Sequence, residues 1–298
     1  TNRGIFAINE LPDLAPRIQV GLLNLLEERD LQIRGFPVRL ALDMLFAFSA
    51  NPEDYTNRGS IITPLRDRIA SQILTHYPPS AALAARITAQ EAWTERDDAP
   101  IVITDESRLL IEEISIAARD SELVDQTSGV SARVAISAIE LLASNLERRA
   151  LTTGDHPVYP RLCDLPPLLP ALTGKLEMVY EGEQQGPEVV ARKLIGMAVR
   201  KLFEGRFPEL ERDVPANPDE PGPYAPILTW FAAGNAVTLS DEMPFAEYAA
   251  ELARVPGLEA LVAPLGGSPE QRAFWSELVL DGLHQSVKLA RHDLDSTV

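Results

Sequence analysis

Polar side chains follow two apolar segments of strand length near the start of the chain. Asn9 and Glu10 come directly after Gly4–Ile8, and Asn51 follows Met44–Ser49. A carboxylate in such a position can act as a general base or as a metal ligand, and an amide can both donate and accept a hydrogen bond. Taken alone, a solvated strand end is the commoner explanation for each residue. Together, the three side chains are candidates for a site that orients water or holds a cation.

Three arginines further along the chain are candidates for binding an anion. Arg66 and Arg68 lie in the segment TPLRDRI, and Arg133 opens a helical segment in GVSARVAI. The planar guanidinium stays charged at neutral pH and matches the oxygens of a phosphate group. A plain surface charge is the alternative for Arg66 and Arg68, and an ordinary helix-start residue is the alternative for Arg133.

The elements that must position the first group of residues alternate between strand and helix up to about residue 78. Strands at 4–8 and 44–49 enclose a helix at 15–29 and a β-hairpin at 31–42. The apolar face of that helix is formed by Ile18, Leu22, Leu25 and Leu26. Continuous apolar strands are typical of a parallel sheet covered by helices on both faces, and such sheets bind ligands at the carboxyl ends of their strands. This arrangement would bring the polar strand ends together.

From about residue 79 the pattern becomes helical. Apolar residues recur at helical spacing in three segments, 80–95, 107–119 and 131–149. Proline-rich stretches, which are candidate boundaries, follow at 156–170 and 207–226. Further helices are predicted at 187–203, 245–254 and 269–291. The expected fold class is therefore α/β at 1–78, helical at 79–152 and mostly α-helical at 153–298, where no motif indicates a role.

Composition narrows the class of protein. The 298 residues carry 27 Lys and Arg against 44 Asp and Glu, a net charge of −17, which repels phosphate backbones and makes nucleic acid an unfavourable partner. A single cysteine, Cys163, excludes an internal disulfide and favours a reducing, cytoplasmic setting. No apolar run reaches the roughly 18 residues that a membrane span needs. We expect no membrane association.

The order of the motifs resembles that of the AAA+ ATPases, in the branch that holds the magnesium chelatase I subunit and the MoxR proteins. NRGIFAINELPDL is similar to the Walker B strand of that family, and LLNLLEERDLQIRG to the helix and hairpin that precede sensor 1. FSANPEDY resembles sensor 1, LRDRI the arginine-finger segment, and SARVAISAIELLA the sensor 2 helix. The resemblance covers residues 1 to about 152. Each motif alone is a weak signal, and the resemblance is specific because all of them occur in the order found in the family.

The resemblance implies a partial P-loop NTPase core at 1–78, a helical lid at 79–152, and ATP with Mg²⁺ as cofactors. It implies that Glu10 orients and polarises the attacking water and that Asn51 holds this water against the γ-phosphate. Arg133 would reach the nucleotide from the lid. Hydrolysis of a γ-phosphate requires an in-line water and neutralisation of the transferring group, which these residue types can supply.

The resemblance also implies a homo-oligomeric ring, most plausibly a hexamer. An arginine finger acts on a nucleotide held by the neighbouring subunit and therefore requires a head-to-tail interface. Arg68 matches the family pattern for the finger, and Arg66, two residues upstream, is a rival. The ring would remodel an unknown client protein, and insertion of a metal into that client is one form of this activity.

Two features depart from the family pattern. The family usually has Asp where Asn9 stands, and Asn is a neutral and weaker oxygen ligand, so Asn9 would hold Mg²⁺ only weakly, through water. The phosphate-binding pattern G-x-x-x-x-G-K-[ST] does not occur in the sequence, because the only Gly-Lys, Gly174-Lys175, is followed by Leu176. In the family this loop precedes the Walker B strand. We therefore expect it upstream of Thr1 and expect the chain alone to bind ATP poorly.

Two other functions remain open. One is a transcription activator that acts on an alternative sigma factor, because bacterial enhancer-binding activators share a similar layout; no helix-turn-helix with a basic recognition helix is evident in the sequence. The other is a non-catalytic interaction subunit, which the neutral Asn9 would allow.

Overall fold

A computed structural model describes residues 2–32, 39–51, 60–96, 100–210 and 222–292. The chain divides into two compact units, Thr1–Tyr77 and Pro78–Val298. The division falls where the periodicity of the sequence changes from alternating strand and helix to helix alone.

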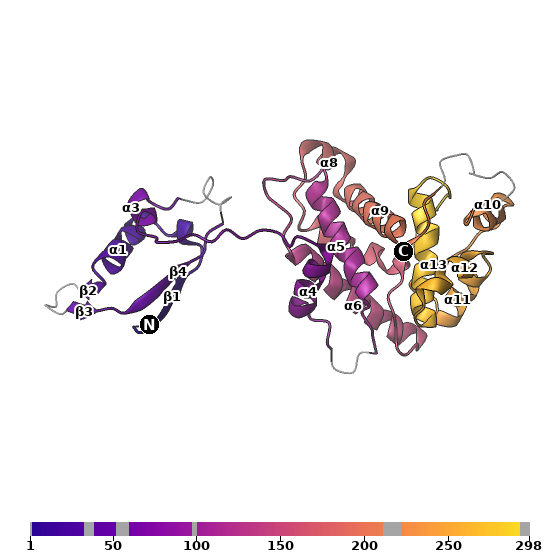
Figure 1. The fold of residues 1–298 in the computed structure, drawn as a ribbon, viewed down its shortest axis with the longest axis horizontal. Coiled ribbons are helices and arrows are strands. Elements are labelled where there is room, and N and C mark those ends of the chain that lie inside the picture. The colour runs from indigo at the N-terminus through magenta and orange to yellow at the C-terminus, as the bar shows by residue number, and fades with distance from the viewer. Residues whose placement is uncertain (1, 33–38, 52–59, 97–99, 211–221, 293–298) are drawn as a thin grey trace. The chain divides into compact units, whose positions relative to one another are not determined.

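The first unit contains short strands and helices (Figure 1). In chain order its elements are β1 Gly4–Ile8, the 3-10 turn η1 Leu11–Asp13, α1 Pro16–Glu27, β2 Asp30–Gln32, β3 Arg39–Ala41, β4 Met44–Phe48 and α3 Thr63–Arg66. The predicted strands at 4–8 and 44–49 and the predicted helix at 15–29 are confirmed to within two residues. Pro16 stands in the first turn of α1, where its missing N–H is harmless.

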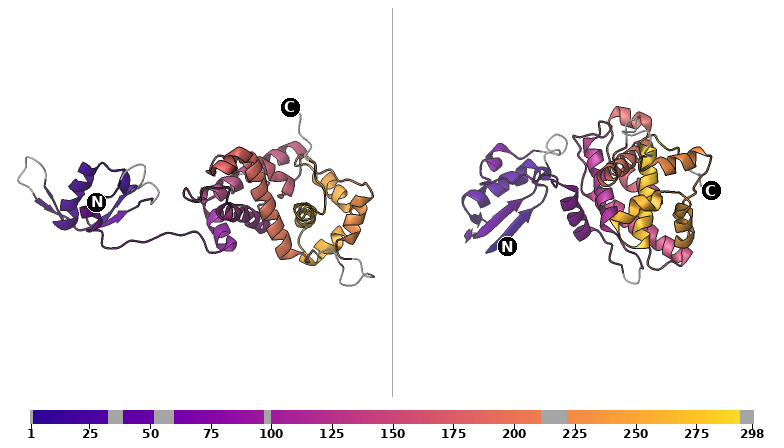
Figure 2. Two further views of the ribbon diagram at one scale, coloured as in Figure 1. Left: turned by 90° about the horizontal axis from the view of Figure 1, so that it is seen from above. Right: turned by 45° about the vertical axis from the view of Figure 1, so that its right-hand side comes forward.

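The two longer strands, β1 and β4, pair in parallel, with Gly4 opposite Met44 and Ile8 opposite Phe48. They lie side by side in Figure 1 and in the right-hand view of Figure 2. The shorter strands β2 and β3 pair antiparallel, as a hairpin requires. The tip of the predicted hairpin, residues 33–38, lies outside the described residues. These pairings confirm an α/β arrangement in the first unit.

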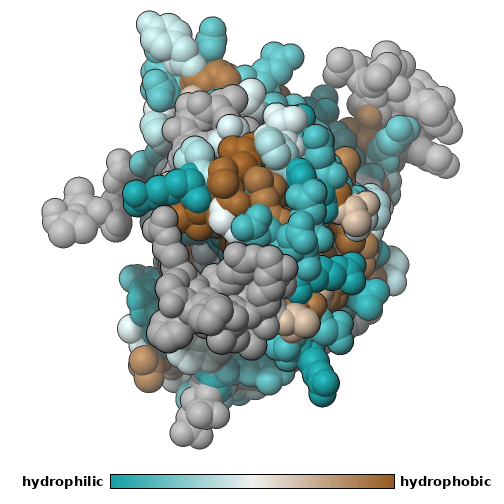
Figure 3. All heavy atoms as spheres, turned by 90° about the vertical axis from the view of Figure 1, so that its left-hand side faces the viewer, coloured by the Kyte–Doolittle hydropathy of each residue, from teal (hydrophilic) through white to brown (hydrophobic). Residues whose placement is uncertain are grey.

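The sheet formed by β1 and β4 is covered on one face only, although apolar strands of this kind predict cover on both. Phe6 and Phe46 point to the half-buried face and meet edge to face, with ring centroids 5.9 Å apart. On the other face Ile5 is 64% exposed and Leu45, its partner in register, is 63% exposed. Apolar side chains therefore reach the solvent here, and Figure 3 shows brown apolar surface among polar side chains on the face that it presents.

The second unit is built from helices. In chain order they are α4 Ala81–Glu91, α5 Asp105–Asp120, α6 Arg133–Thr153, η2 Leu162–Asp164, η3 Pro166–Leu168, α7 Leu169–Thr173, α8 Tyr180–Gln185, α9 Pro187–Arg206, α10 Ala225–Ala232, α11 Phe245–Ala253, α12 Leu258–Val262, η4 Ala263–Leu265 and α13 Pro269–Gln285. Each predicted helix has a counterpart in this series. None of the helices that the structure describes combines the length and the apolar character that crossing a bilayer requires.

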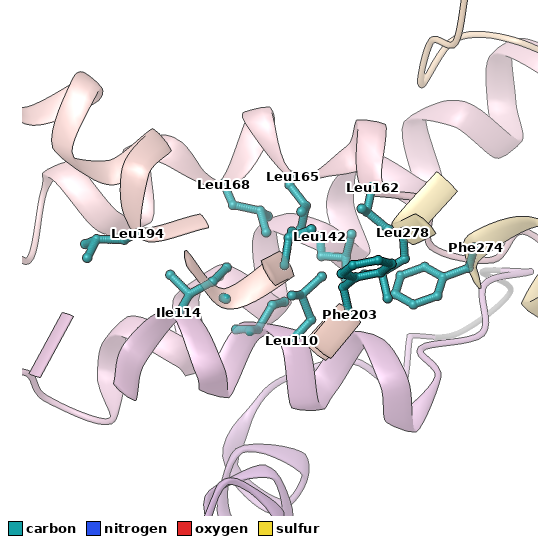
Figure 4. Packing of buried hydrophobic residues seen from close by; sticks show 14 of the residues in the cluster. Leu110, Ile114, Leu142, Leu162, Leu165, Leu168, Leu194, Phe203, Phe274 and Leu278 are labelled. Atoms are coloured by element: carbon teal, nitrogen blue, oxygen red, sulfur yellow. The ribbon is translucent and has the colours of Figure 1, made fainter. Parts of the chain in front are cut away.

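One apolar core runs through the second unit, so the structure places no division at residue 152 within the described residues. The predicted lid and C-terminal region would meet at that point, and α6 ends one residue later, at Thr153. Figure 4 shows Leu110 and Leu142 from the earlier part packed with Phe203 and Leu278 from the later part. All four side chains are at most 1% exposed. The helices before and after residue 152 therefore fold around a shared core.

Charged side chains are also buried in this core, and each has partners. Arg149 and Asp164 are fully buried and form an ion pair at 2.6 Å. The side-chain amide of Asn145 donates to the same carboxylate oxygen at 2.8 Å. A buried charge is tolerated when an opposite charge and hydrogen bonds replace the water that it loses. This network fixes α6 against η2.

Glu277 on α13 is a buried carboxyl group without a cationic hydrogen-bond partner among the contacts that the structure describes. Its Oε2 accepts hydrogen bonds from the N–H of Leu162 and the hydroxyl of Tyr248, each at 2.6 Å. Burial in the core raises the pKa of Glu277 from 4.5 to about 7. The folded state therefore binds a proton at pH values where the unfolded chain has lost it.

This difference predicts a loss of stability with rising pH. Between about pH 4.5 and pH 7 the folded state holds the proton of Glu277 more tightly than the unfolded state does, so the free energy of unfolding falls as pH rises. At about 1.4 kcal/mol per pKa unit, the full loss is about 3 kcal/mol. Glu277→Gln keeps an oxygen acceptor without a titrating proton. Denaturant unfolding measures the free energy of unfolding at pH 5 and at pH 8. From pH 5 to pH 8 the difference between variant and wild type should change by about 3 kcal/mol in favour of the variant, because only the wild type loses this stability.

Glu259→Gln is the matched control, because Glu259 is an exposed carboxylate on the neighbouring helix α12. Its difference from the wild type should be the same at both pH values. A difference between wild type and Glu277→Gln that does not change with pH would contradict the assignment of a raised pKa to Glu277.

Candidate functional site

The carboxyl ends of β1 and β4 are tied together by Ser49. Its hydroxyl accepts a hydrogen bond from the N–H of Glu10 at 3.1 Å and donates one to the Oδ1 of Asn9 at 3.4 Å. Its backbone continues the ladder, since its N–H donates to Ile8 at 3.0 Å and its carbonyl accepts from Leu11 at 2.9 Å. One residue thus fixes the chain on both sides of the Asn9-Glu10 pair.

Glu10 has an unusual backbone conformation. Its φ of 51° and ψ of 55° lie in the left-handed helical region, which a residue with a side chain seldom adopts. This conformation turns the chain sharply from β1 into η1 and leaves the side chain exposed. Strained backbone of this kind persists where surrounding contacts hold it, and it clusters at functional sites. Ser49 and the buried Leu11 supply such contacts here.

Asn51 follows the neighbouring strand and is exposed. Because β1 and β4 are parallel and adjacent, Glu10 and Asn51 follow the same edge of the sheet. The close approach of their side chains, which the sequence predicts, stays a prediction. The residues directly beyond Asn51, 52–59, lie outside the described part of the chain.

The arginine segment is attached to α1 by one fully buried side chain, Gln19. Its amide nitrogen donates to the carbonyls of Leu14 at 2.9 Å and Ser60 at 3.0 Å. Its oxygen accepts from the N–H of Ile62 at 2.9 Å, directly before α3. Both amide hydrogens and the oxygen of Gln19 are thus used. This clamp fixes the start of the helix that carries Arg66.

The two candidate finger arginines differ in their surroundings. Arg68 donates to one carboxylate oxygen of Glu27 from two nitrogens, at 2.8 and 3.0 Å, and to the carbonyl of Pro64 at 2.8 Å. Both partners of the ion pair are partly exposed, so the pair is worth at most about 1 kcal/mol. Arg66 is exposed, and no partner of its side chain is found among the described residues.

Arg133 belongs to the second unit, where it is the first residue of α6. Its side chain is exposed, and its N–H donates to the hydroxyl of Ser131 at 3.2 Å. A cation at the start of a helix lies at the positive end of the helix dipole and gains nothing from it. Stabilisation of the helix therefore does not explain this residue.

The oxygen donors at the sheet edge suit a hard cation. Asn9 offers a neutral amide oxygen and Glu10 a carboxylate, and Mg²⁺ in proteins is commonly held by one or two such groups together with water. Within the described residues no group of three or more His, Cys, Asp or Glu could hold a metal ion.

The sequence analysis missed two residues that hold this site, Ser49 and Gln19. Ser49 was treated as the last residue of a strand. Gln19 lies three residues before Leu22, on the predicted apolar face of α1, and a polar residue on such a face was the available signal. The structure buries Gln19 and leaves Ile18, which was assigned to that face, 48% exposed.

No known protein family matches this sequence, and no curated protein matches it. An assignment of function therefore depends on the residues at the sheet edge and on their geometry.

The clamp formed by Gln19 predicts a local effect of its removal. Gln19→Ala leaves two carbonyls and one N–H without their partners, which costs about 1–3 kcal/mol for each of these groups that stays buried. Hydrogen exchange followed by mass spectrometry should show faster exchange in peptides covering residues 60–69. The second unit should keep the exchange rates of the wild type.

Gln72→Ala is the control, because Gln72 is exposed and lies in the same unit. It should leave exchange at 60–69 unchanged. Equal exchange in Gln19→Ala and wild type would mean that other contacts position the arginine segment.

Proposed function

We propose that the full-length protein that carries this chain is an ATP-hydrolysing ring protein of the AAA+ type, similar to the magnesium chelatase I subunit and MoxR branch, which remodels a partner protein. The observation that carries the proposal is the junction at the sheet edge. There Asn9 and Glu10 follow one parallel strand, Asn51 follows its neighbour, and Ser49 bonds to both members of the first pair.

Glu10 is the proposed water-orienting residue. A carboxylate that is held in a fixed position can accept a proton from water. It can also orient that water so that the lone pair of the water oxygen points at the phosphorus atom. The left-handed backbone of Glu10 and the hydrogen bond from its N–H to Ser49 support such a fixed position. Asn51 would hold the same water through its amide, which can donate and accept at once.

Bound ATP would supply the γ-phosphoryl group, and Mg²⁺ would neutralise its charge. Asn9 would hold the cation through water, and Arg133 would bind phosphate oxygens. The loop that cradles the phosphates is absent from the printed sequence. We propose that further polypeptide supplies it and covers the open sheet face, because Ile5 and Leu45 expose an apolar surface that a parallel sheet normally buries.

An arginine donated by a neighbouring subunit completes the proposed site. Arg68 is the candidate that the family pattern favours, and it must first leave Glu27. That step costs little, because the ion pair is partly exposed. Arg66 needs no such step as far as the described residues show. Either arginine requires a head-to-tail interface, which closes into a ring, and a hexamer is the proposed form.

The proposed setting is the cytoplasm, in keeping with a single cysteine, and the client is a protein whose remodelling can include insertion of a metal. A non-catalytic interaction subunit is the second candidate. The neutral Asn9 favours it, since an uncharged oxygen at the magnesium position weakens cation binding.

The role of Glu10 predicts the behaviour of one variant. In the full-length protein, Glu10→Gln should bind ATP with unchanged affinity while turnover falls at least about a hundredfold, because an amide is a far weaker base than a carboxylate. Phosphate release measures turnover, and a fluorescent nucleotide measures binding.

Glu28→Gln is the control, because Glu28 is an exposed carboxylate directly after α1. It should keep both properties. Turnover at the wild-type rate in Glu10→Gln would remove Glu10 from the mechanism. Nucleotide binding without turnover in the wild-type ring would favour the interaction subunit.

The trans-acting arginine predicts complementation. Arg68→Ala and Glu10→Gln subunits of the full-length protein should each be inactive alone. Mixed rings contain interfaces that pair an intact Glu10 with an intact Arg68, so partial ATPase activity should return. The same mixture is made with Arg66→Ala, and mass measurement confirms that the rings are mixed.

Rescue only in the Arg66→Ala mixture would move the finger two residues upstream. Mixed rings of either kind without any activity would show that neither arginine acts on the neighbouring subunit.

A further inference from the structure

An exposed tryptophan, Trp93, stands at the edge of an open groove in the second unit. Its side chain is 67% exposed, which is unusual for so large an apolar group. The groove beside it has a volume of about 430 Å³. Its apolar lining comes from Trp93, Leu141, Pro170 and Ala171. Trp93 lies two residues beyond α4, Leu141 lies on α6, and Pro170 and Ala171 lie on α7, so the groove lies between elements of one shared core.

Trp93 is held rigidly even though it is exposed. The backbone N–H of Trp93 donates to the carboxylate of Glu140 at 3.1 Å, which fixes the main chain at this residue. The guanidinium of Arg96 lies over the indole ring, 4.8 Å from its centroid. Arg96 in turn donates to the hydroxyl of Ser144 at 3.1 Å, to the carbonyl of Glu140 at 3.1 Å and to the carboxylate of Glu147. The indole is therefore positioned before any ligand arrives, which lowers the entropy that binding costs.

Among the charged side chains around the groove, some have a hydrogen-bond or ion-pair partner within the described residues and one does not. Glu147 is used by Arg96, and Glu140 accepts from Trp93. Lys175, which also lines the groove, is exposed and has no side-chain partner among the described residues. A ligand that brings a carboxylate would give this ammonium group an ion pair. The chain carries a net charge of −17, so attraction of an anion here is local, within the roughly 8 Å over which charges act at physiological salt.

We propose that this groove binds a segment of a partner protein in which an apolar side chain stands beside an aspartate or glutamate. The apolar side chain packs against Trp93, and the carboxylate pairs with Lys175. Tryptophan and arginine are the residues that most often dominate protein interfaces. A small molecule fits less well, because such ligands bury most of their surface, whereas the indole here stands largely in solvent. The proposal is independent of the ATPase activity.

Selection of random phage-displayed dodecapeptides on the full chain tests the proposal. Peptides that bind the wild type should share an apolar residue next to Asp or Glu. A selected peptide, made synthetically, should bind Trp93→Ala at least about tenfold more weakly, since loss of an interface anchor has effects of this size. Lys175→Glu should weaken the same peptide about fivefold or more, and a version with Lys in place of its acidic residue should recover affinity for Lys175→Glu.

Two matched variants separate this groove from exposed surface in general. Tyr180→Ala removes another exposed aromatic side chain, and Lys193→Glu reverses another exposed charge. Both should bind the peptide as the wild type does, and thermal unfolding should show all four variants folded. Equal binding by wild type and Trp93→Ala would overturn the proposal. A second result would also overturn it. If the NMR signal of the Trp93 indole shifts on addition of indole-3-acetate but with none of the peptides, the groove is a small-molecule site.

Discussion

The parallel pairing of β1 with β4 is the constraint on which the candidate site depends. Parallel strands end at the same edge of a sheet, so residues that lie about forty positions apart in the chain come to one place. Ser49 turns this proximity into a fixed geometry, because a single hydroxyl can accept from one backbone N–H and donate to one side chain. The left-handed conformation of Glu10 costs free energy, and the hydrogen bonds on both sides of this residue offset that cost.

A second polar side chain extends this geometry to the arginines. Gln19 is buried among apolar side chains, and an unpaired amide in that position would be costly. It is stable there because the backbone around residues 60–62 completes its hydrogen bonds. The sheet, α1 and α3 are thereby linked through directional contacts, while the apolar cluster around Leu11, Leu22 and Leu65 supplies most of the burial. The polar groups fix how these elements are oriented, and the burial of apolar side chains supplies most of the free energy that stabilises them.

The second unit uses buried polar groups in another way. Arg149 and Asp164 neutralise each other inside the core, whereas burial raises the pKa of Glu277 to about 7, so its carboxyl group binds a proton below that pH. Near its surface the same principle positions Trp93, because Arg96 donates to four acceptors and lies against one face of the indole. An exposed aromatic ring with a fixed orientation is suited to recognition, and a mobile one is not.

The sequence by itself determined the elements, because helices and strands follow from local spacing of apolar residues. It therefore placed β1, β4, α1 and the longer helices α4, α5, α6, α9, α11 and α13, but not the short helices between them, and it placed Glu10 and Asn51 at strand ends. Tertiary structure decided which side chains hold them. Glu27 pairs with Arg68 from 41 residues away, and Gln19 is fully buried whereas Ile18 of the predicted apolar face is 48% exposed. The shared core across residue 152 is likewise a product of long-range packing, which local periodicity does not encode.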